Sequence, residues 1–112
     1  MASLRWRHSL QMTVFYFAYN SNNALPPLPK IDAREMPNQF QGVFESDENI
    51  WARVRNHPLF EGLVANTIKY HELWGNVAVG CQYGKHRSRA VAEMAAHRMD
   101  KRAEPWTPDS LN

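Results

Sequence analysis

The most informative part of the chain reads Val77-Ala78-Val79-Gly80-Cys81-Gln82-Tyr83-Gly84-Lys85-His86-Arg87-Ser88-Arg89 and continues into an alanine-rich run from Ala90 to Met99. Its first residues are apolar and largely β-branched, which is typical of a buried strand. A short loop with a thiol and a glycine follows, and then a helical pattern that opens with basic residues. The stretch therefore predicts a strand, a loop and a helix in that order, the unit from which α/β proteins are built.

The start of the predicted helix has the chemistry of an anion site. The first backbone N–H groups of a helix lack intrahelical partners, and the helix dipole adds partial positive charge there. Gly84 allows a positive φ and a close approach of the backbone to a ligand. Arg87 can offer a planar fork to two phosphate oxygens, whereas Lys85 offers a compact charge. His86 is a third donor, and Ser88 can act as helix N-cap or bind the anion. We therefore expect a phosphate site at this loop.

Cys81 ends the predicted strand, where a positive field lowers a thiol pKa and favours the thiolate. The alternative is that Cys81 is a small buried filler of the core, which is the commoner role of a lone cysteine. Arg89 adds a further donor near the same point, but it can instead be a solvated helix residue that pairs with Glu93 one turn later.

Length and composition limit the other possibilities. With 112 residues the chain has room for one domain, and 44% hydrophobic residues indicate a globular fold. A net charge of +2 is too weak on its own to indicate a nucleic-acid partner. A single cysteine excludes an intrachain disulfide, and no apolar run reaches the ~20 residues of a membrane span. The sequence therefore predicts a cytoplasmic protein without a membrane partner.

Periodicity and turn residues divide the chain into three parts: a basic N-terminal arm (1–11), a single α/β domain (12–103) and a proline-containing tail (104–112). Strands are expected at 13–19, 30–34 and 76–80, a loop at 39–45, and helices from 46 or 47 to 56, from 58 onwards and at 88–102. Together these elements predict a small three-layer α/β domain, with a short, mostly parallel sheet and helices packed on it.

In open parallel sheets, ligands bind beyond the carboxyl ends of the strands. This rule makes Tyr19, Asn20, Asp32 and Arg34 expected neighbours of the Cys81 loop, although they are far from it in sequence. Two alternatives remain open. Asp32 can be a structural partner of Arg34 or of a loop N–H, and Tyr19 can belong to strand packing.

At several separated positions the chain resembles the C-terminal domain of RapZ-type RNase adapter proteins. That family's signature reads Gly-Cys-x-x-Gly-x-His-Arg-Ser, and residues 80–88 match it. Phe15-Tyr16-Phe17 is similar to the family's opening strand, Ile31-Asp32-Ala33-Arg34 to its Asp-Val-Arg segment, and Met36-Pro37-Asn38 to the loop that follows. The resemblance covers approximately residues 12–99. It implies a small α/β domain that binds a phosphorylated amino sugar, glucosamine-6-phosphate, and communicates with RNA or protein partners.

By matching position, the resemblance implies ligand contacts from Gln82, Gly84, His86 and Arg87, with Cys81 shaping the loop. Tyr19 stands where the family has a proposed ligand histidine, and Tyr83 replaces the first glycine of its Gly-Gly pair. Full-length adapters also carry a nucleotide-binding domain. Nothing here matches Gly-x-x-x-x-Gly-Lys-Ser/Thr, so we expect a free-standing binding domain with a regulatory role, no cofactor and no ATP or GTP hydrolysis.

The rival hypothesis is an enzyme, because residues 81–87 also fit Cys-x-x-x-x-x-Arg and so resemble the phosphate loop of cysteine-dependent tyrosine phosphatases. Cys81 would then be the nucleophile, Arg87 would bind the equatorial oxygens, and Ser88 would help the leaving thiolate. The fold would have to supply Asp32 or Asp47 as general acid. One short motif supports this hypothesis, whereas several separated segments support the binding domain.

Two further kinds of site are less well supported. Cys81, His86 and His97 lack the spacing of a metal motif, so no metal site is predicted. An RNA partner would have basic and aromatic residues available, namely Arg5, Trp6, Arg7, Trp51, Arg53 and Arg55, but exposed helix charges explain Arg53 and Arg55 equally well. A protein partner and a homo-oligomer both remain open.

Overall fold

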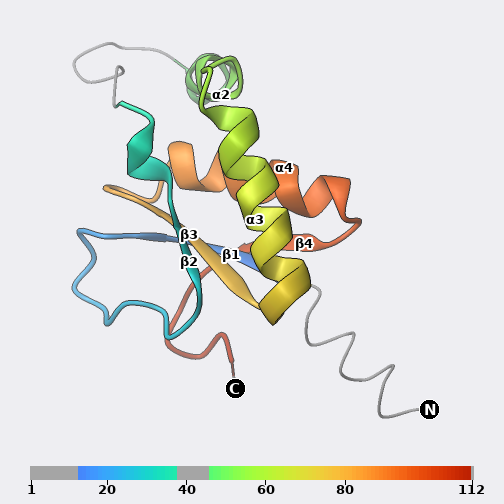
Figure 1. The fold of residues 1–112 in the computed structure, drawn as a ribbon. Helices are drawn as coiled ribbons and strands as arrows, with labels where there is room; N and C mark the ends of the chain where they lie inside the picture. Colours follow the sequence, from blue (N-terminus) through green and yellow to red (C-terminus); the bar gives the residue numbers. More distant parts are fainter. Residues whose placement is uncertain (1–12, 38–45, 112) are drawn as a thin grey trace.

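The computed structural model describes residues 13–37 and 46–111, so the N-terminal arm (1–11) and the loop at 39–45 lie outside the described residues. Within them, four strands form one sheet in the order β2-β3-β1-β4 (Figure 1). They are β1 (Thr13–Ala18), β2 (Lys30–Asp32), β3 (Val77–Cys81) and β4 (Arg102–Pro105). Every pairing is parallel, with Val14 opposite Val77 and Ile31 opposite Val79. The predicted α/β class and parallel sheet are confirmed.

Three α-helices follow the predicted segments: α2 (Asp47–Arg55), α3 (Phe60–Trp74) and α4 (Arg87–Arg98). Ser46 is the N-cap of α2, and its hydroxyl accepts a hydrogen bond from the backbone N–H of Asn49 at 3.2 Å. Gly75 ends α3 with a φ of 84°, a conformation that glycine adopts easily. A short 3₁₀-helix, η1 (Ala33–Glu35), replaces the end of the predicted second strand, because the Asp32 side chain caps it.

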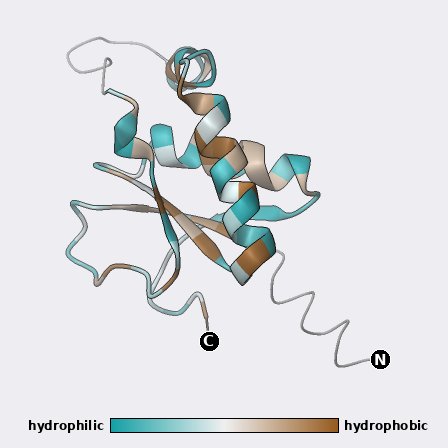
Figure 2. Ribbon diagram, in the orientation of Figure 1, coloured by the Kyte–Doolittle hydropathy of each residue, from teal (hydrophilic) through white to brown (hydrophobic). Residues whose placement is uncertain are grey.

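The three helices lie on one face of the sheet (Figure 1). Alternate residues of the central strands, Val14, Val77 and Val79 among them, join buried residues of the helices in the main core. The opposite face buries Phe15, Phe17 and Ala78 beneath Tyr19, Leu28 and Trp106 rather than beneath a helix. Figure 2 shows that the central strands are mainly apolar, whereas the helices contain both polar and apolar residues.

The C-terminal segment differs from the sequence prediction. Helix α4 ends at Arg98 rather than at 102, and Asp100 reverses the chain with a φ of 56°. Arg102–Pro105 then forms β4, so the segment expected to be a tail from 104 begins inside the sheet. The alanine, lysine and arginine content of this region favours helix, but pairing with β1 satisfies its backbone groups and overrides that preference.

Within residues 13–37 and 46–111, none of the helices combines the length and the apolar character that crossing a membrane requires.

Candidate anion-binding site

Cys81 is the last residue of β3, and its side chain is only 2% exposed. Its Sγ lies 3.2 Å from Ser88 Oγ and accepts a hydrogen bond from the backbone N–H of Gly84, also at 3.2 Å. The sulfur therefore ties the strand, the loop and the first turn of α4 together. These contacts are compatible both with a structural thiol and with a thiolate stabilised by two donors.

Gly84 has a φ of 67°, so the predicted positive φ is confirmed. A Cβ on this residue would lie 2.9 Å from both Ala18 Cβ and the Ala18 backbone nitrogen. The loop is thus packed directly onto the end of β1. Tyr19 and Asn20 continue this contact, because their N–H groups donate to the carbonyls of Cys81 and Gln82 at 2.9 and 3.0 Å. Both residues are therefore neighbours of the loop, as the strand-end rule predicts.

Helix α4 begins at Arg87, one residue earlier than predicted. His86 occupies the N-cap position and its side chain makes no capping hydrogen bond. Of the two roles considered for Ser88, that of N-cap is wrong, since Ser88 lies inside the first turn and is fully buried against Cys81. The partial positive charge at the start of α4 is accordingly not offset by a capping side chain.

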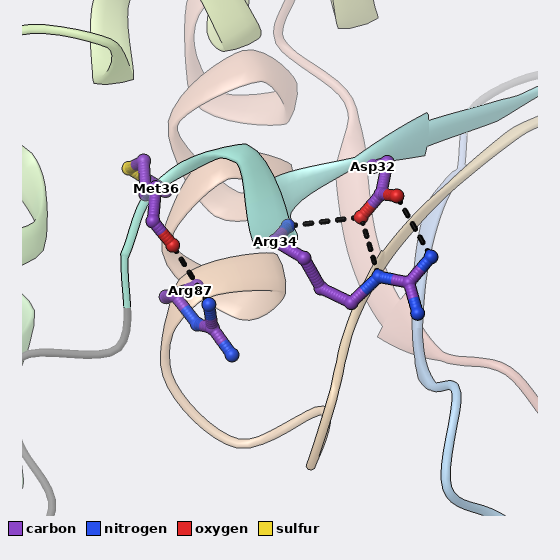
Figure 3. Close-up of polar contacts among 4 residues, drawn as sticks. All are labelled: Asp32, Arg34, Met36 and Arg87. Atoms are coloured by element: carbon purple, nitrogen blue, oxygen red, sulfur yellow. Dashed lines mark hydrogen bonds and ion pairs between the residues drawn. The ribbon is translucent and has the colours of Figure 1, made fainter.

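Arg87 is the buried cation of the site, with 7% of its surface exposed. Its NH1 donates to the backbone carbonyl of Met36 at 2.7 Å, a contact that spans 51 residues of sequence (Figure 3). This bond holds the guanidinium between α4 and the end of η1. Because a guanidinium has several N–H groups, one bond to Met36 still leaves donors for an anion.

Asp32 and Arg34 form a two-point ion pair beside Arg87 (Figure 3). Arg34 Nε donates to Asp32 Oδ1 at 2.9 Å, and Arg34 NH2 donates to Oδ2 at 2.8 Å. Of the alternatives left open for Asp32, the pairing with Arg34 is the one that the structure contains. The guanidinium of Arg34 also lies over the Tyr19 ring, 3.7 Å from its centroid, so Tyr19 serves as a platform for this cation.

Arg34 controls the titration of Asp32. Its hydrogen bonds are the main cause that holds the pKa of Asp32 below the usual value, and the positive charge of Arg87 contributes in the same direction. The pKa of Arg34 is raised, chiefly by its hydrogen bond to Asp32, with the charges of Tyr19 and Cys81 as smaller causes. The electrostatic environment of Arg34 thus includes Asp32, Tyr19 and the thiol, which brings the predicted residues of both strand ends together.

The Asp32–Arg34 pair predicts how stability depends on pH. Since the pKa of Asp32 is lower in the folded than in the unfolded chain, its stabilising contribution is complete above the unfolded pKa and is lost as the pH falls through the folded pKa. We expect the midpoint temperature of thermal unfolding to decrease as the pH is lowered from about 5 to about 2, and to decrease less in Asp32→Asn. Calorimetry across this range measures the difference, and identical slopes for the two proteins would contradict the assignment.

The remaining residues of the loop differ in their exposure and in their contacts. Lys85 is exposed and Gln82 is half-buried. His86 Nε2 lies 2.9 Å from Asp47 Oδ1, in the first turn of α2, and the imidazole stands edge-on to Trp51 with a centroid distance of 6.1 Å. Sequence reasoning missed this link, which joins residues 39 positions apart without any local signal. His86 thus anchors α2 to the loop in addition to its predicted role as a donor.

Arg89 forms the expected pair with Glu93, with 2.7 Å between Nε and Oε1. It also lies 5.1 Å from the centroid of Trp51 and 5.9 Å from that of Tyr16, and neither ring was predicted to be its partner. The Arg89 guanidinium is therefore held by Glu93 and by the two rings. The sequence does not reveal this cluster, because its members come from β1, α2 and α4.

The two candidate general acids of a phosphatase both form ion pairs with basic side chains. Asp32 is paired with Arg34, and Asp47 is paired with His86, whose hydrogen bond is the main cause that lowers the pKa of Asp47. A general acid must hold a proton near the working pH, which a lowered pKa disfavours. Among the described residues there is also no cluster of three or more side chains of the kinds that bind a metal ion.

Comparison with known proteins adds no family assignment. No family model matches the chain, and the search of curated proteins gave no significant match. The resemblance to RapZ-type C-terminal domains thus rests on the residues quoted for it.

Proposed function

We propose that the protein is a binding domain for a small phosphorylated ligand, with a regulatory or adapter role in the cytoplasm. The anion is held at the start of α4 by the loop 81–88. The observation that carries this proposal is the burial of Arg87 at the first position of the helix. Burying an arginine so that only 7% of its surface is exposed is costly unless hydrogen bonds or an anion compensate its charge, and its hydrogen-bond partner within the described residues is the neutral carbonyl of Met36.

The surroundings of Arg87 support the same function. Arg34 adds a second guanidinium, whose charge its partner Asp32 largely neutralises but whose remaining N–H groups are donors. The uncapped first turn of α4 and the exposed Lys85 add further positive potential. A phosphate dianion would complement this set of donors, with Gln82, Gly84, His86 and Ser88 as the surrounding loop residues. The amino-sugar phosphate is suggested by the family resemblance alone, as are RNA or protein partners.

A cysteine-dependent phosphatase is the second candidate. The contacts of Cys81 Sγ with the Gly84 N–H and the Ser88 hydroxyl favour it, because both groups can stabilise a thiolate. The engagement of Asp32 and Asp47 in ion pairs disfavours it, because neither carboxyl is arranged to donate a proton to a leaving group. Binding without turnover is therefore the better supported of the two functions.

Phosphorus NMR distinguishes the two functions. We expect the resonance of glucosamine-6-phosphate or an aryl phosphate to broaden or shift on addition of the protein, without the appearance of inorganic phosphate. Cys81→Ser should bind similarly, because serine retains a polar atom at the same position. Release of phosphate by the wild type but not by Cys81→Ser would establish the phosphatase. Unchanged spectra with every phosphate compound, in a folded protein, would exclude both.

A further inference from the structure

Two adjoining hollows lie beside the anion loop, at the carboxyl ends of β1 and β4. The first has a volume of about 200 Å³, and Tyr83 and Gly84 of the loop form part of its wall. The second has a volume of about 350 Å³ and is bounded by Pro108 and Leu111. Both hollows share Leu25 and Trp106 as wall residues. The loop that would hold an anion therefore borders a space large enough for an organic group.

The described residues that line both hollows are uncharged. Within residues 13–37 and 46–111, no Asp, Glu, Lys, Arg or His contributes to either wall. Aromatic rings from β1, the loop and the residue after β4 contribute to the wall of the first hollow, while prolines and leucines make up most of the second. The polar groups of the first hollow are neutral hydroxyl, amide and indole groups, and one of them is tied into the loop, since Ser21 Oγ accepts a hydrogen bond from the backbone N–H of Asn23. Such walls fit an apolar or aromatic group and offer no carboxylate to an ammonium group.

The walls are held in place by the fold. The Trp106 backbone N–H donates to the Tyr16 carbonyl at 2.8 Å, which extends the pairing of β4 with β1. The Trp106 ring stands edge-on to Phe15 with a centroid distance of 5.3 Å. At the rim, Leu25 and Tyr83 remain 50% and 57% exposed, so an apolar group placed there would cover surface that water now contacts.

We infer that the phosphorylated ligand carries an uncharged aromatic or aliphatic group, which occupies the hollow between Tyr83, Leu25 and Trp106 while its anion is held at the start of α4. This inference rests on the proposed function, because it places the second half of the ligand at the same loop. Gly84 connects the two halves, since it belongs both to the anion loop and to the wall of the hollow. An amino sugar lacks such a group, so the inference changes the expected class of ligand from phosphosugars to aryl or alkyl phosphates.

Two phosphonates separate the anion site from the hollow, because phosphonates resist hydrolysis. Methylphosphonate tests the anion site alone, and naphthylmethylphosphonate adds the aromatic group. By isothermal titration calorimetry we expect the naphthyl compound to bind at least about tenfold more tightly, since burying such a group is worth more than the free energy of a tenfold change in affinity. Leu25→Asp should remove most of this advantage and leave the affinity for methylphosphonate within about twofold.

The matched control is Leu73→Asp, because Leu73 is 59% exposed on α3 and lines neither hollow. It should leave both affinities unchanged. Equal affinities of wild type for the two phosphonates would overturn the inference and leave the proposed anion site intact. Binding of 2-naphthol as tight as that of the naphthyl phosphonate would also overturn it, by making the hollow an independent site. If neither phosphonate binds, the anion site itself is wrong, and the inference fails with it.

Discussion

Arg87→Ala should weaken the binding of inorganic phosphate by roughly 10- to 150-fold. The guanidinium is held at the first position of α4 by its bond to the Met36 carbonyl, so its remaining N–H groups are oriented before a ligand arrives. Hydrogen bonds to a charged group are worth about 1.5–3 kcal/mol each, which corresponds to that range of affinity. Titration followed by phosphorus NMR or calorimetry measures the change in the dissociation constant.

The same substitution should also lower stability, which must be separated from the loss of binding. Removing Arg87 leaves the Met36 carbonyl without its donor, at a cost of about 1–3 kcal/mol. Arg87→Lys keeps the charge but not the planar fork, so we expect an intermediate affinity. Arg98→Ala is the control on the same helix, because Arg98 is exposed and pairs with Glu61 far from the loop. Phosphate affinity equal to wild type in a folded Arg87→Ala protein would refute the anion site.

Much of the fold follows from local patterns in the sequence. The run from Val77 to Cys81 is buried on both faces, and such continuous apolar runs are typical of central parallel strands. Ser46 precedes α2 with a hydroxyl in the capping position, which marks the start of that helix. Gly84 between a strand and a basic helix start indicates a turn with positive φ. Each of these signals involves neighbouring residues, so one sequence was sufficient to recognise them.

Two of the incorrect predictions involve tertiary contacts that override local preference. Residues 102–105 have a composition that suits a helix, yet they complete the sheet because the edge of β1 is available to pair with them. The start of α4 at Arg87 moves Ser88 inward, where the hydroxyl meets Cys81 instead of capping the helix. Neither outcome is encoded in the spacing of residues along the chain.

The same contrast between local signals and tertiary contacts applies to the candidate site. The loop and its Cys81, Gly84 and Arg87 could be predicted because they are contiguous in sequence. Its supporting contacts could not, because they bring together residues from different elements. Met36 meets Arg87 across 51 residues, and Asp47 meets His86 across 39. The strand-end rule was the one long-range argument available, and it correctly brought Tyr19 and Asn20 to the loop.

Gly84→Ala should destabilise the protein by about 2–5 kcal/mol, the sum of two effects. An L-residue at a φ of 67° is strained, and the added Cβ would approach the Ala18 backbone nitrogen to 2.9 Å. The backbone of β1 cannot yield easily, because it pairs with β3 on one side and β4 on the other. The loop must therefore shift, which also breaks the bond from the Gly84 N–H to Cys81 Sγ and should weaken phosphate binding. Urea denaturation measures the loss of stability.

Gly62→Ala is the matched control, and the opposite sign is expected for it. Gly62 lies within α3, and a Cβ there would meet nothing within 4 Å. Alanine should stabilise the helix by up to about 1 kcal/mol, because it loses less backbone entropy on folding than glycine. The phosphate affinity should remain that of wild type, since α3 contributes no residue to the loop. If the two substitutions instead changed stability by similar amounts, the Gly84 conformation would not be a constraint on this fold.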